Sequence, residues 1–138
     1  RLNGIKRMVE IGGSRYTNAL FISEKGNIEF KKENYLEAVN FFESAISLDD
    51  QQYLYFENAA ITYDNLKDYS KAEEYFNKVI YDFKTKDGKS EFFKGLMLIK
   101  NSNKQKGCEY LEISAKKNYT GIESGLRAII VYRQLCQG

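Results

Sequence analysis

Two cysteines are the most reactive side chains in this chain of 138 residues, and histidine is absent. Without histidine, the chain lacks both the usual proton shuttle near pH 7 and the commonest metal ligand. Two isolated cysteines cannot complete a four-ligand zinc site, and no glycine-rich loop is placed to cradle a phosphate. The composition therefore predicts a protein that is not an enzyme and that needs no cofactor or metal.

Residue types recur along the chain with a step of 34 or 35 residues. Two columns of small residues, one of large apolar residues and one of short polar residues keep this step. In that order they are Gly26, Ala60 and Gly95; Ala38, Ala72 and Gly107; Phe42, Phe76 and Leu111; and Asn34, Asp68 and Asn103. A period of this length is typical of a solenoid built from repeated helix-turn-helix units. The sequence therefore predicts an all-α solenoid.

Apolar residues at helical spacing and the absence of proline predict three helix pairs. The first helices cover about residues 14–32, 52–66 and 90–100, and the second helices end near residues 48, 83 and 117. Asn34, Asp68 and Asn103 precede the second helices, where each side chain can accept from free backbone amides, and Glu37 completes a capping box with Asn34. The predicted units are residues 14–49, 50–84 and 85–118.

Both ends of the chain lie outside these units. Thr120 and Glu123 form another capping-box pattern, which predicts a capping helix within residues 119–138 that covers the last repeat. Residues 1–13 are either a loosely packed arm or the remnant of a preceding helix. A step back of 34 residues from Ala38, Phe42 and Ala45 lands on Gly4, Met8 and Ile11. The start at Arg1 instead of Met predicts a processed or excised product.

These expected helices place the two cysteines apart. With one helix ending near Lys117 and the next starting near Gly121, Cys108 lies nine residues from the turn and Cys136 fifteen. At about 1.5 Å per residue the offset is roughly 9 Å, more than a disulfide tolerates without bending. Free, partly buried thiols are the favoured prediction; the alternative, a disulfide, implies an oxidising compartment.

Charge is divided unequally along the chain, although the formal net charge is only +2. Residues 15–83 carry 7 basic and 13 acidic side chains, a net of −6, whereas residues 84–138 carry 11 basic and 5 acidic, a net of +6. This polarity fits solvated faces, a partner steered by the positive half, or head-to-tail self-association. No code for reading bases is recognisable, no run of 18 apolar residues predicts a membrane span, and the sequence assigns no compartment.

The chain resembles the tetratricopeptide-repeat (TPR) family over about residues 18–136. The residues that carry the resemblance are Gly26-Asn27, Tyr35, Ala38, Phe42 and Ala45 in the first copy, Tyr63, Tyr69, Ala72 and Phe76 in the second, and Gly95, Gly107 and Leu111 in the third. The end of the chain is similar to the closing segment of certain small bacterial members, although the proline and tryptophan common in the family are missing. The resemblance implies a right-handed superhelix of three helix pairs and a capping helix, with the first helices lining a concave groove.

Family positions, carried across one by one, imply which side chains face this groove. The binding residues implied are Asn27, Asn58, Asn65, Lys89, Phe93, Leu96 and Lys100. An asparagine amide offers donors and an acceptor to an extended peptide backbone, and an exposed Phe93 would serve as an aromatic anchor. The same positions place Ser23 and Glu57 in the groove.

One subclass of the family grips the C-terminal carboxylates of chaperone tails with two asparagines and three basic residues. Asn27, Asn58 and Lys89 match three of those positions. Ser23 and Phe93 occupy the other two, which removes much of the charge that would offset desolvation of a carboxylate. The sequence does not predict a complete clamp.

The predicted function is a non-catalytic scaffold that binds a peptide or partner segment in the groove, where the lysines favour an acidic partner. The alternative is an assembly module that mediates self-association or docks onto a neighbouring domain. Neither prediction involves nucleic acid.

Overall fold

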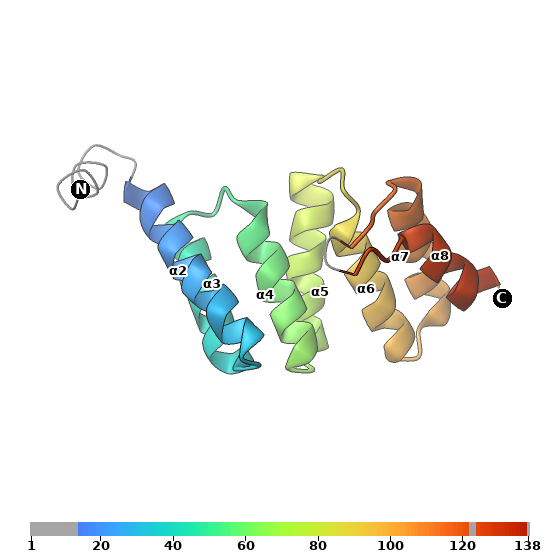
Figure 1. Ribbon diagram of the computed structural model, residues 1–138, viewed down its shortest axis with the longest axis horizontal. Coiled ribbons are helices and arrows are strands. Elements are labelled where there is room, and N and C mark those ends of the chain that lie inside the picture. The colour runs from blue at the N-terminus through green and yellow to red at the C-terminus, as the bar shows by residue number, and fades with distance from the viewer. Residues whose placement is uncertain (1–13, 122–123, 138) are drawn as a thin grey trace. The chain divides into compact units, whose positions relative to one another are not determined.

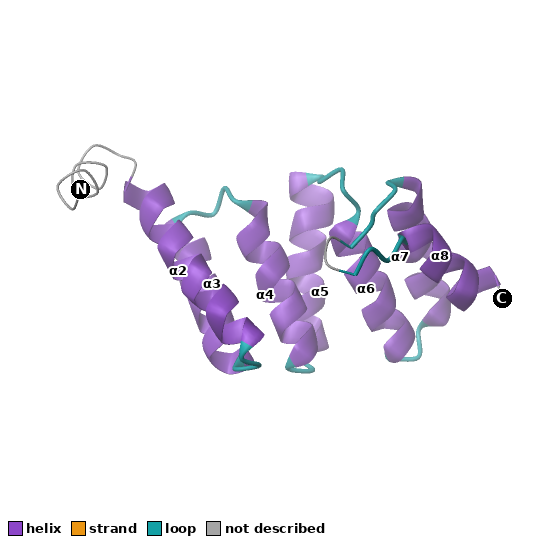
Figure 2. Ribbon diagram, viewed as in Figure 1, coloured by secondary structure: helices purple, strands orange, loops and turns teal. Residues whose placement is uncertain are grey.

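The computed structural model describes residues 14–121 and 124–137. Within these ranges the chain is all-α, as predicted, and short loops join the helices (Figure 2). The chain divides between Tyr75 and Phe76 into two compact units, called unit 1 and unit 2 below.

Unit 1 is built from antiparallel helix pairs that follow one another along the chain (Figure 1). It contains α2 (Ser14–Lys31), α3 (Tyr35–Leu48), α4 (Tyr53–Asn65) and most of α5 (Tyr69–Asn77). One buried cluster joins Ala38, Val39 and Phe42 of α3 to Ala59 of α4. A second cluster joins Ala19 of α2, Ala45 of α3 and Tyr55 of α4. Apolar residues at helical spacing therefore form the core of this unit.

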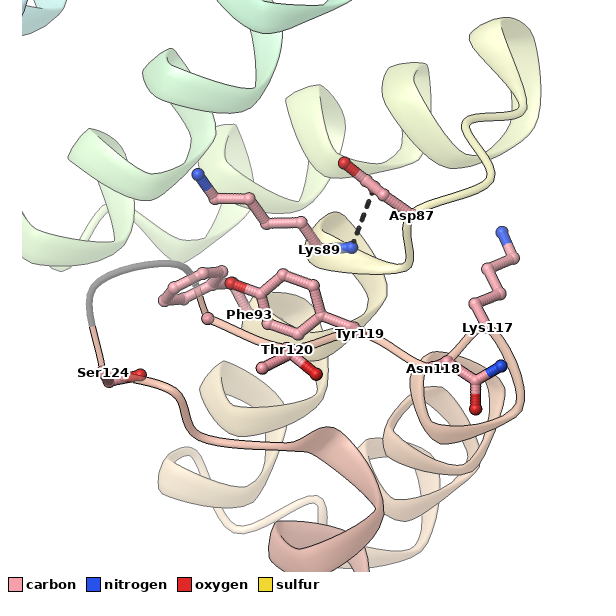
Figure 3. A pocket seen from close by; sticks show the side chains of 9 residues that line it. Asp87, Lys89, Phe93, Lys117, Asn118, Tyr119, Thr120 and Ser124 are labelled. Carbon is pink, nitrogen blue, oxygen red and sulfur yellow. Dashed lines mark hydrogen bonds between the residues drawn. The ribbon is translucent and has the colours of Figure 1, made fainter.

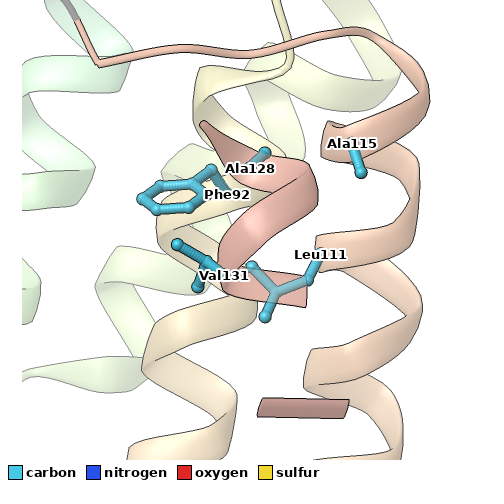
Figure 4. Close-up of a cluster of buried hydrophobic side chains, with 5 residues drawn as sticks. All are labelled: Phe92, Leu111, Ala115, Ala128 and Val131. Carbon is cyan, nitrogen blue, oxygen red and sulfur yellow. The ribbon is translucent and has the colours of Figure 1, made fainter. Parts of the chain in front are cut away.

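Unit 2 contains the end of α5, the π-helical turn η1 (Lys78–Phe83), α6 (Lys89–Lys100), α7 (Lys104–Lys116), α8 (Ala128–Tyr132) and the π-helical turn η2 (Arg133–Gln137). Its core joins one residue of α6 to residues of α7 and α8 (Figure 4). The members are Phe92, Leu111, Ala115, Ala128 and Val131. The capping helix predicted from the sequence thus covers the last helix pair.

The small residues of the repeat lie where paired helices cross. A Cβ atom placed on Gly26 would lie 2.7 Å from Cε1 of Phe42, and one placed on Gly95 would lie 2.8 Å from the carbonyl oxygen of Gly107. Such distances are shorter than real Cβ contacts, so any larger residue would push the helices apart. The small residues that recur at this step therefore allow the paired helices to cross closely.

The two helices of each pair are joined by the same kind of turn. Its central residue lies in the left-handed region, with φ of 63° at Glu33, 63° at Lys67 and 66° at Ser102. The N–H of the following residue donates to a carbonyl five residues back, at 2.9 Å from Asn34 to Glu29, 3.0 Å from Asp68 to Tyr63 and 2.8 Å from Asn103 to Leu98. This is the Schellman pattern of helix ends. Sequence reasoning missed it because glycine, the usual residue in that conformation, is absent from all three positions.

The predicted helix caps hold at two of three positions. The side chain of Asp68 accepts from the backbone N–H of Lys71 at 3.2 Å, and the side chain of Asn103 accepts from that of Lys106 at 3.4 Å. Asn34 sits at the cap position of α3, but its side chain makes no cap bond. Its amide donates instead to Glu29 at 2.9 Å, so the predicted side-chain cap at Asn34 is wrong.

The C-terminal helix begins later than predicted. Thr120 pairs with Arg127 in an isolated antiparallel bridge, and α8 starts only at Ala128. The N–H of Gly121 donates to the carbonyl of Leu126 at 2.9 Å, so this backbone group is already satisfied without a helix. Glu123, the other half of the predicted capping box, lies outside the described residues.

Cys108 and Cys136 form a disulfide, with their Cα atoms 5.8 Å apart. The prediction of free thiols was wrong because it started the last helix at Gly121. With α8 starting at Ala128, Cys136 lies eight residues after the start of that helix, and Cys108 lies eight residues before the end of α7 at Lys116. The two cysteines are therefore equally far from the connection, within the range that a disulfide can span.

Candidate functional site

The described part of unit 2 contains an open pocket of about 790 Å³ beside the start of α6 (Figure 3). It lies between α6 and the segment that follows α7. The lining residues are Asp87, Lys89, Phe93, Lys117, Asn118, Tyr119, Thr120, Gly121 and Ser124. Two predicted binding residues, Lys89 and Phe93, therefore lie in one pocket.

A tight turn positions the first turn of α6 at the pocket. Gly88 has φ of 78°, a conformation that favours glycine. Its carbonyl accepts from Oγ of the buried Ser114 at 2.8 Å, and Asp87 accepts from the backbone N–H of Lys89 at 3.1 Å. The carboxylate of Asp87 thus satisfies a backbone donor at the start of the helix.

The two lysines of the pocket have different surroundings. Nζ of Lys117 pairs with the carboxylate of Glu91, which is fully buried, and donates to the carbonyl of Thr85 at 2.8 Å. That cation offsets a charge that would otherwise be buried alone. Among the described lining residues, Lys89 is the cation with no ion pair, so its charge remains available to a ligand.

Aromatic rings form one wall of the pocket. Phe92 is buried in the core and meets Tyr119 with ring centroids 5.0 Å apart. The half-buried Phe93 contacts Phe92 edge to face at 5.4 Å and turns toward the pocket beside Tyr119 (Figure 3). The wall therefore offers apolar surface next to the ammonium of Lys89.

The other predicted residues of α6 do not line this pocket. Leu96 packs against the hydrophobic core of unit 2, and Lys100 is exposed in the last turn of the helix. Sequence reasoning missed Lys117, Asn118 and Tyr119 as pocket residues because it expected a helix to begin immediately after them. Asn118 is the residue type that could have indicated a helix end here, because asparagine tolerates the left-handed region. Its φ of 59° matches that of the turn residues above.

The three predicted asparagines belong to unit 1 and differ in what they bond. The Asn65 amide donates to the carbonyl of Ile61 in its own helix at 2.9 Å, and the Asn27 amide donates to Glu24 at 3.5 Å. The half-buried Asn58 side chain has no hydrogen-bond partner among the described residues. Asn58 is therefore the asparagine whose amide is most available.

Two further residues that family positions place in the groove are core residues. Ser23 is 3% exposed and Glu57 is 0% exposed. By contrast, Leu20 and Leu54, which share one position of the repeat, are both exposed. The solvent-facing surface of the first helices in unit 1 therefore combines Leu20 and Leu54 with the asparagines.

Polar groups in the interior of both units serve the fold. In unit 1, Glu43 accepts from Tyr63 at 2.8 Å and from Tyr75 at 2.7 Å. Burial, together with these hydrogen bonds, raises the pKa of both phenols. In unit 2, Nζ of the buried Lys94 donates to Asn77 at 2.5 Å and to Tyr110 at 2.9 Å. Neither group faces the pocket.

The described residues contain no cluster of acidic, cysteine or histidine side chains suited to a metal ion. Among the same residues, no helix is both long and apolar enough to cross a membrane. The arrangement around the pocket offers a cation, aromatic surface, hydroxyls and an amide. These groups can bind an acidic or amphipathic segment.

The fold is that of a helical-repeat protein, and its second unit has an open pocket. The family model for the tetratricopeptide repeat matches residues 22–52 and 55–81, which overlap the first two predicted units. The match identifies two tetratricopeptide repeats within residues 22–81.

Similarity to individual proteins agrees with this assignment. The heat shock protein sti1 homolog of Schizosaccharomyces pombe is 35% identical over 51 residues, which make up 37% of this chain and 9% of that protein. The matched segment therefore covers less than a tenth of the length of this curated relative.

Two solved TPR structures share the fold. The first TPR of Spaghetti (RPAP3), bound to the HSP90 peptide SRMEEVD, has a TM-score of 0.73 and 23% identity, covering 86% of this chain and 90% of that one. The TPR domain of Arabidopsis OM64 has a TM-score of 0.75 and 20% identity, covering 89% of this chain and 98% of that one.

Proposed function

We propose that this protein is a non-catalytic interaction module that binds a peptide segment of a partner protein. The observation that carries the proposal is the unit 2 pocket, which brings Lys89 and Phe93 together with Tyr119. Concave sites with apolar walls and a few convergent polar groups are the usual binding sites of proteins. An acidic residue of the peptide would pair with Lys89, and a neighbouring apolar residue would pack on Phe93.

The charge of the chain supports an acidic partner. Residues 84–138, which include the pocket, carry a net charge of +6. A positive region of this size attracts acidic segments at a distance and raises their association rate at low ionic strength. Lys100, exposed on the same helix as Lys89, adds to this field.

Unit 1 offers a second contact surface for a peptide backbone. The available amide of Asn58 can both donate to and accept from an extended chain, and the exposed Leu54 lies one helical turn before it. We propose Asn58 as the main polar contact of this unit, supported by Asn27. Asn65 contributes less because its amide already bonds its own helix.

The comparison with the peptide-bound Spaghetti domain supports peptide binding in general. It does not support an identical carboxylate clamp, because Ser23 is buried and Phe93 is aromatic where the clamp has basic residues. We propose that the acidic contact here depends on Lys89 and the aromatic wall.

A peptide array probed with the full chain tests this function. One half of the array carries peptides with acidic residues next to aromatic or aliphatic ones, and the other half carries the same peptides with amides replacing the acids. We expect preferential binding to the acidic half, and about tenfold weaker binding by Phe93→Ala in fluorescence anisotropy. Leu36→Ala, which removes an exposed apolar side chain of α3 in unit 1, is the control.

Two outcomes would overturn the proposal. One is binding that survives both Phe93→Ala and Lys89→Glu at full strength. The other is the absence of any peptide bound above background on the array. Circular dichroism melting of each variant ensures that a loss of binding is not a loss of folding.

A second candidate function is assembly, and one observation favours it. Phe21 and Ile28 of α2 are each 53% exposed, although they belong to the first helix of a repeat. Large apolar side chains that share one exposed helix face often mark an interface.

A further inference from the structure

One face of α2 is exposed where the equivalent face of α4 is buried. The step of 34 residues places Phe21 at the position of Tyr55 and Ile28 at the position of Thr62. Tyr55 is 3% exposed and Thr62 is 0% exposed, whereas Phe21 and Ile28 are both 53% exposed. In unit 1, Tyr55 packs against Ala45 of α3, the second helix of the preceding pair. The corresponding face of α2 has no described helix against it (Figure 1).

The start of α2 differs from the start of α4. The turn between α3 and α4 occupies residues 49–52, and the equivalent residues 15–18 are helical in α2. Residues 15–18 therefore extend α2 where the equivalent residues before α4 form a turn. The expectation of a helix remnant within residues 2–11 falls outside the described residues.

The exposed face of α2 complements itself in the antiparallel sense. Thr17, Phe21, Glu24 and Ile28 follow one another at spacings of four, three and four residues, so they form one seam of the helix. If two copies pair about a two-fold axis between Glu24 and Lys25, Phe21 of one copy meets Ile28 of the other. The same axis brings Glu24 of one copy to Lys25 of the other.

We infer that this face of α2, centred on Phe21, Glu24, Lys25 and Ile28, binds a second copy of the chain as an antiparallel helix pair. An isologous interface needs a patch that is complementary to itself, and this face has an apolar residue at each end and opposite charges at its centre. Phe21 and Ile28 lie about 10.5 Å apart along the helix, two turns at a rise of 1.5 Å per residue. Two equal apolar contacts therefore flank two equal ion pairs.

The charged side chains of this face are accessible to a second copy. Glu24 and Lys25 are both exposed, and the contact of Glu24 inside the chain is a long hydrogen bond of 3.5 Å from Asn27. A single pair of helices buries less than the roughly 1,200 Å² of a standard interface, so the dimer is weak and concentration-dependent. The face is separate from the pocket of unit 2, and dimerisation does not depend on peptide binding.

Charge reversal tests the pairing and its register. Glu24→Lys and Lys25→Glu each turn two attractive contacts into two repulsive ones, so each single variant should dimerise at least about fivefold more weakly in sedimentation equilibrium. Mixing the two single variants in equal amounts should restore dimers, because one copy then presents two lysines and the other two glutamates. The double variant Glu24→Lys/Lys25→Glu should dimerise like the original chain.

Apolar substitutions test the rest of the face. Phe21→Ser and Ile28→Ser should abolish measurable dimers, while Leu36→Ser, which changes an exposed leucine of α3, should leave them intact. Phe93→Ala should also leave dimerisation unchanged, which separates this inference from the proposed peptide site.

Three results would overturn the inference. The original chain could remain monomeric at concentrations up to about 1 mM, which corresponds to the weakest dissociation constant that such a measurement detects. This result would include the case in which residues 1–13 cover the face within one copy. Dimers could persist in Phe21→Ser and Ile28→Ser. Finally, the original chain could form dimers while the mixture of Glu24→Lys and Lys25→Glu does not. That result would exclude the antiparallel register.

Discussion

The first helices of the two units differ in what covers them. In unit 2, the segment after α7 lays Tyr119 on Phe92 of α6, and α8 closes the core through Ala128 and Val131. In unit 1, α2 keeps Phe21 and Ile28 exposed. The first helix of unit 2 thus has a covered aromatic residue, and the first helix of unit 1 has an exposed one. The repeat itself decides which side chains share a face, and elements outside the repeat decide whether that face becomes core or interface.

The strongest test of this comparison removes one packing residue from the core of each unit. Phe42→Ala in unit 1 should cost about 3–5 kcal/mol, because the fully buried ring fills the space against Gly26. Leu111→Ala in unit 2 should cost about 2–5 kcal/mol for the same reason. Urea denaturation followed by circular dichroism measures both. Changes below about 1 kcal/mol would show that these residues are not the packing centres.

Removing the disulfide should affect unit 2 and spare unit 1. Its half-cystines are 28 residues apart, and closing a loop of that length stabilises by about 3–4 kcal/mol in the chain-entropy model. We expect Cys108→Ser/Cys136→Ser to lower the free energy of unfolding by a similar amount. Hydrogen exchange should then report faster opening of α7 and α8 while α3 stays protected.

The control for this prediction is the original chain with and without a dithiol reductant. It should reproduce the loss, whereas the double serine variant should not respond to reductant at all. Equal acceleration of exchange in α3 would contradict the assignment of the effect to unit 2.

The helix caps give a smaller, matched comparison within unit 1. Asp68→Ala should cost about 1 kcal/mol because its side chain bonds the N–H of Lys71. Asn34→Ala should cost less, since Asn34 makes no cap bond and only its exposed contact with Glu29 is lost. Thermal melting of the two variants measures the difference. Equal losses would mean that the cap bond of Asp68 adds nothing.

The smallest effect concerns the turn between the helices. Lys67→Gly should stabilise the chain by up to about 1 kcal/mol, because glycine adopts the left-handed conformation without the steric cost that lysine carries. The flexibility of glycine in the unfolded chain offsets part of this gain. Chemical denaturation of Lys67→Gly against Lys67→Ala separates the backbone effect from loss of the side chain. A Lys67→Gly variant less stable than Lys67→Ala would contradict the turn geometry.

Sequence reasoning worked best where structure depends on near neighbours. The first and second helices lie within a few residues of their predicted bounds, because apolar spacing and caps such as Asp68 act over one or two helical turns. It worked less well in the candidate site. Lys89 and Phe93 were expected to bind, but Tyr119 and Lys117 join them through contacts over 26 residues or more, between Phe92 and Tyr119 and between Glu91 and Lys117.

The sequence by itself determined the period, and with it the helix pairs and the close crossings at Gly26 and Gly95. Those properties follow from residue size and spacing within a single repeat. Only the tertiary structure decided that α8 begins at Ala128, that Cys108 meets Cys136, and that Phe21 stays exposed. Each of these depends on which distant backbone or side-chain group is available as a partner. A local pattern does not carry that information.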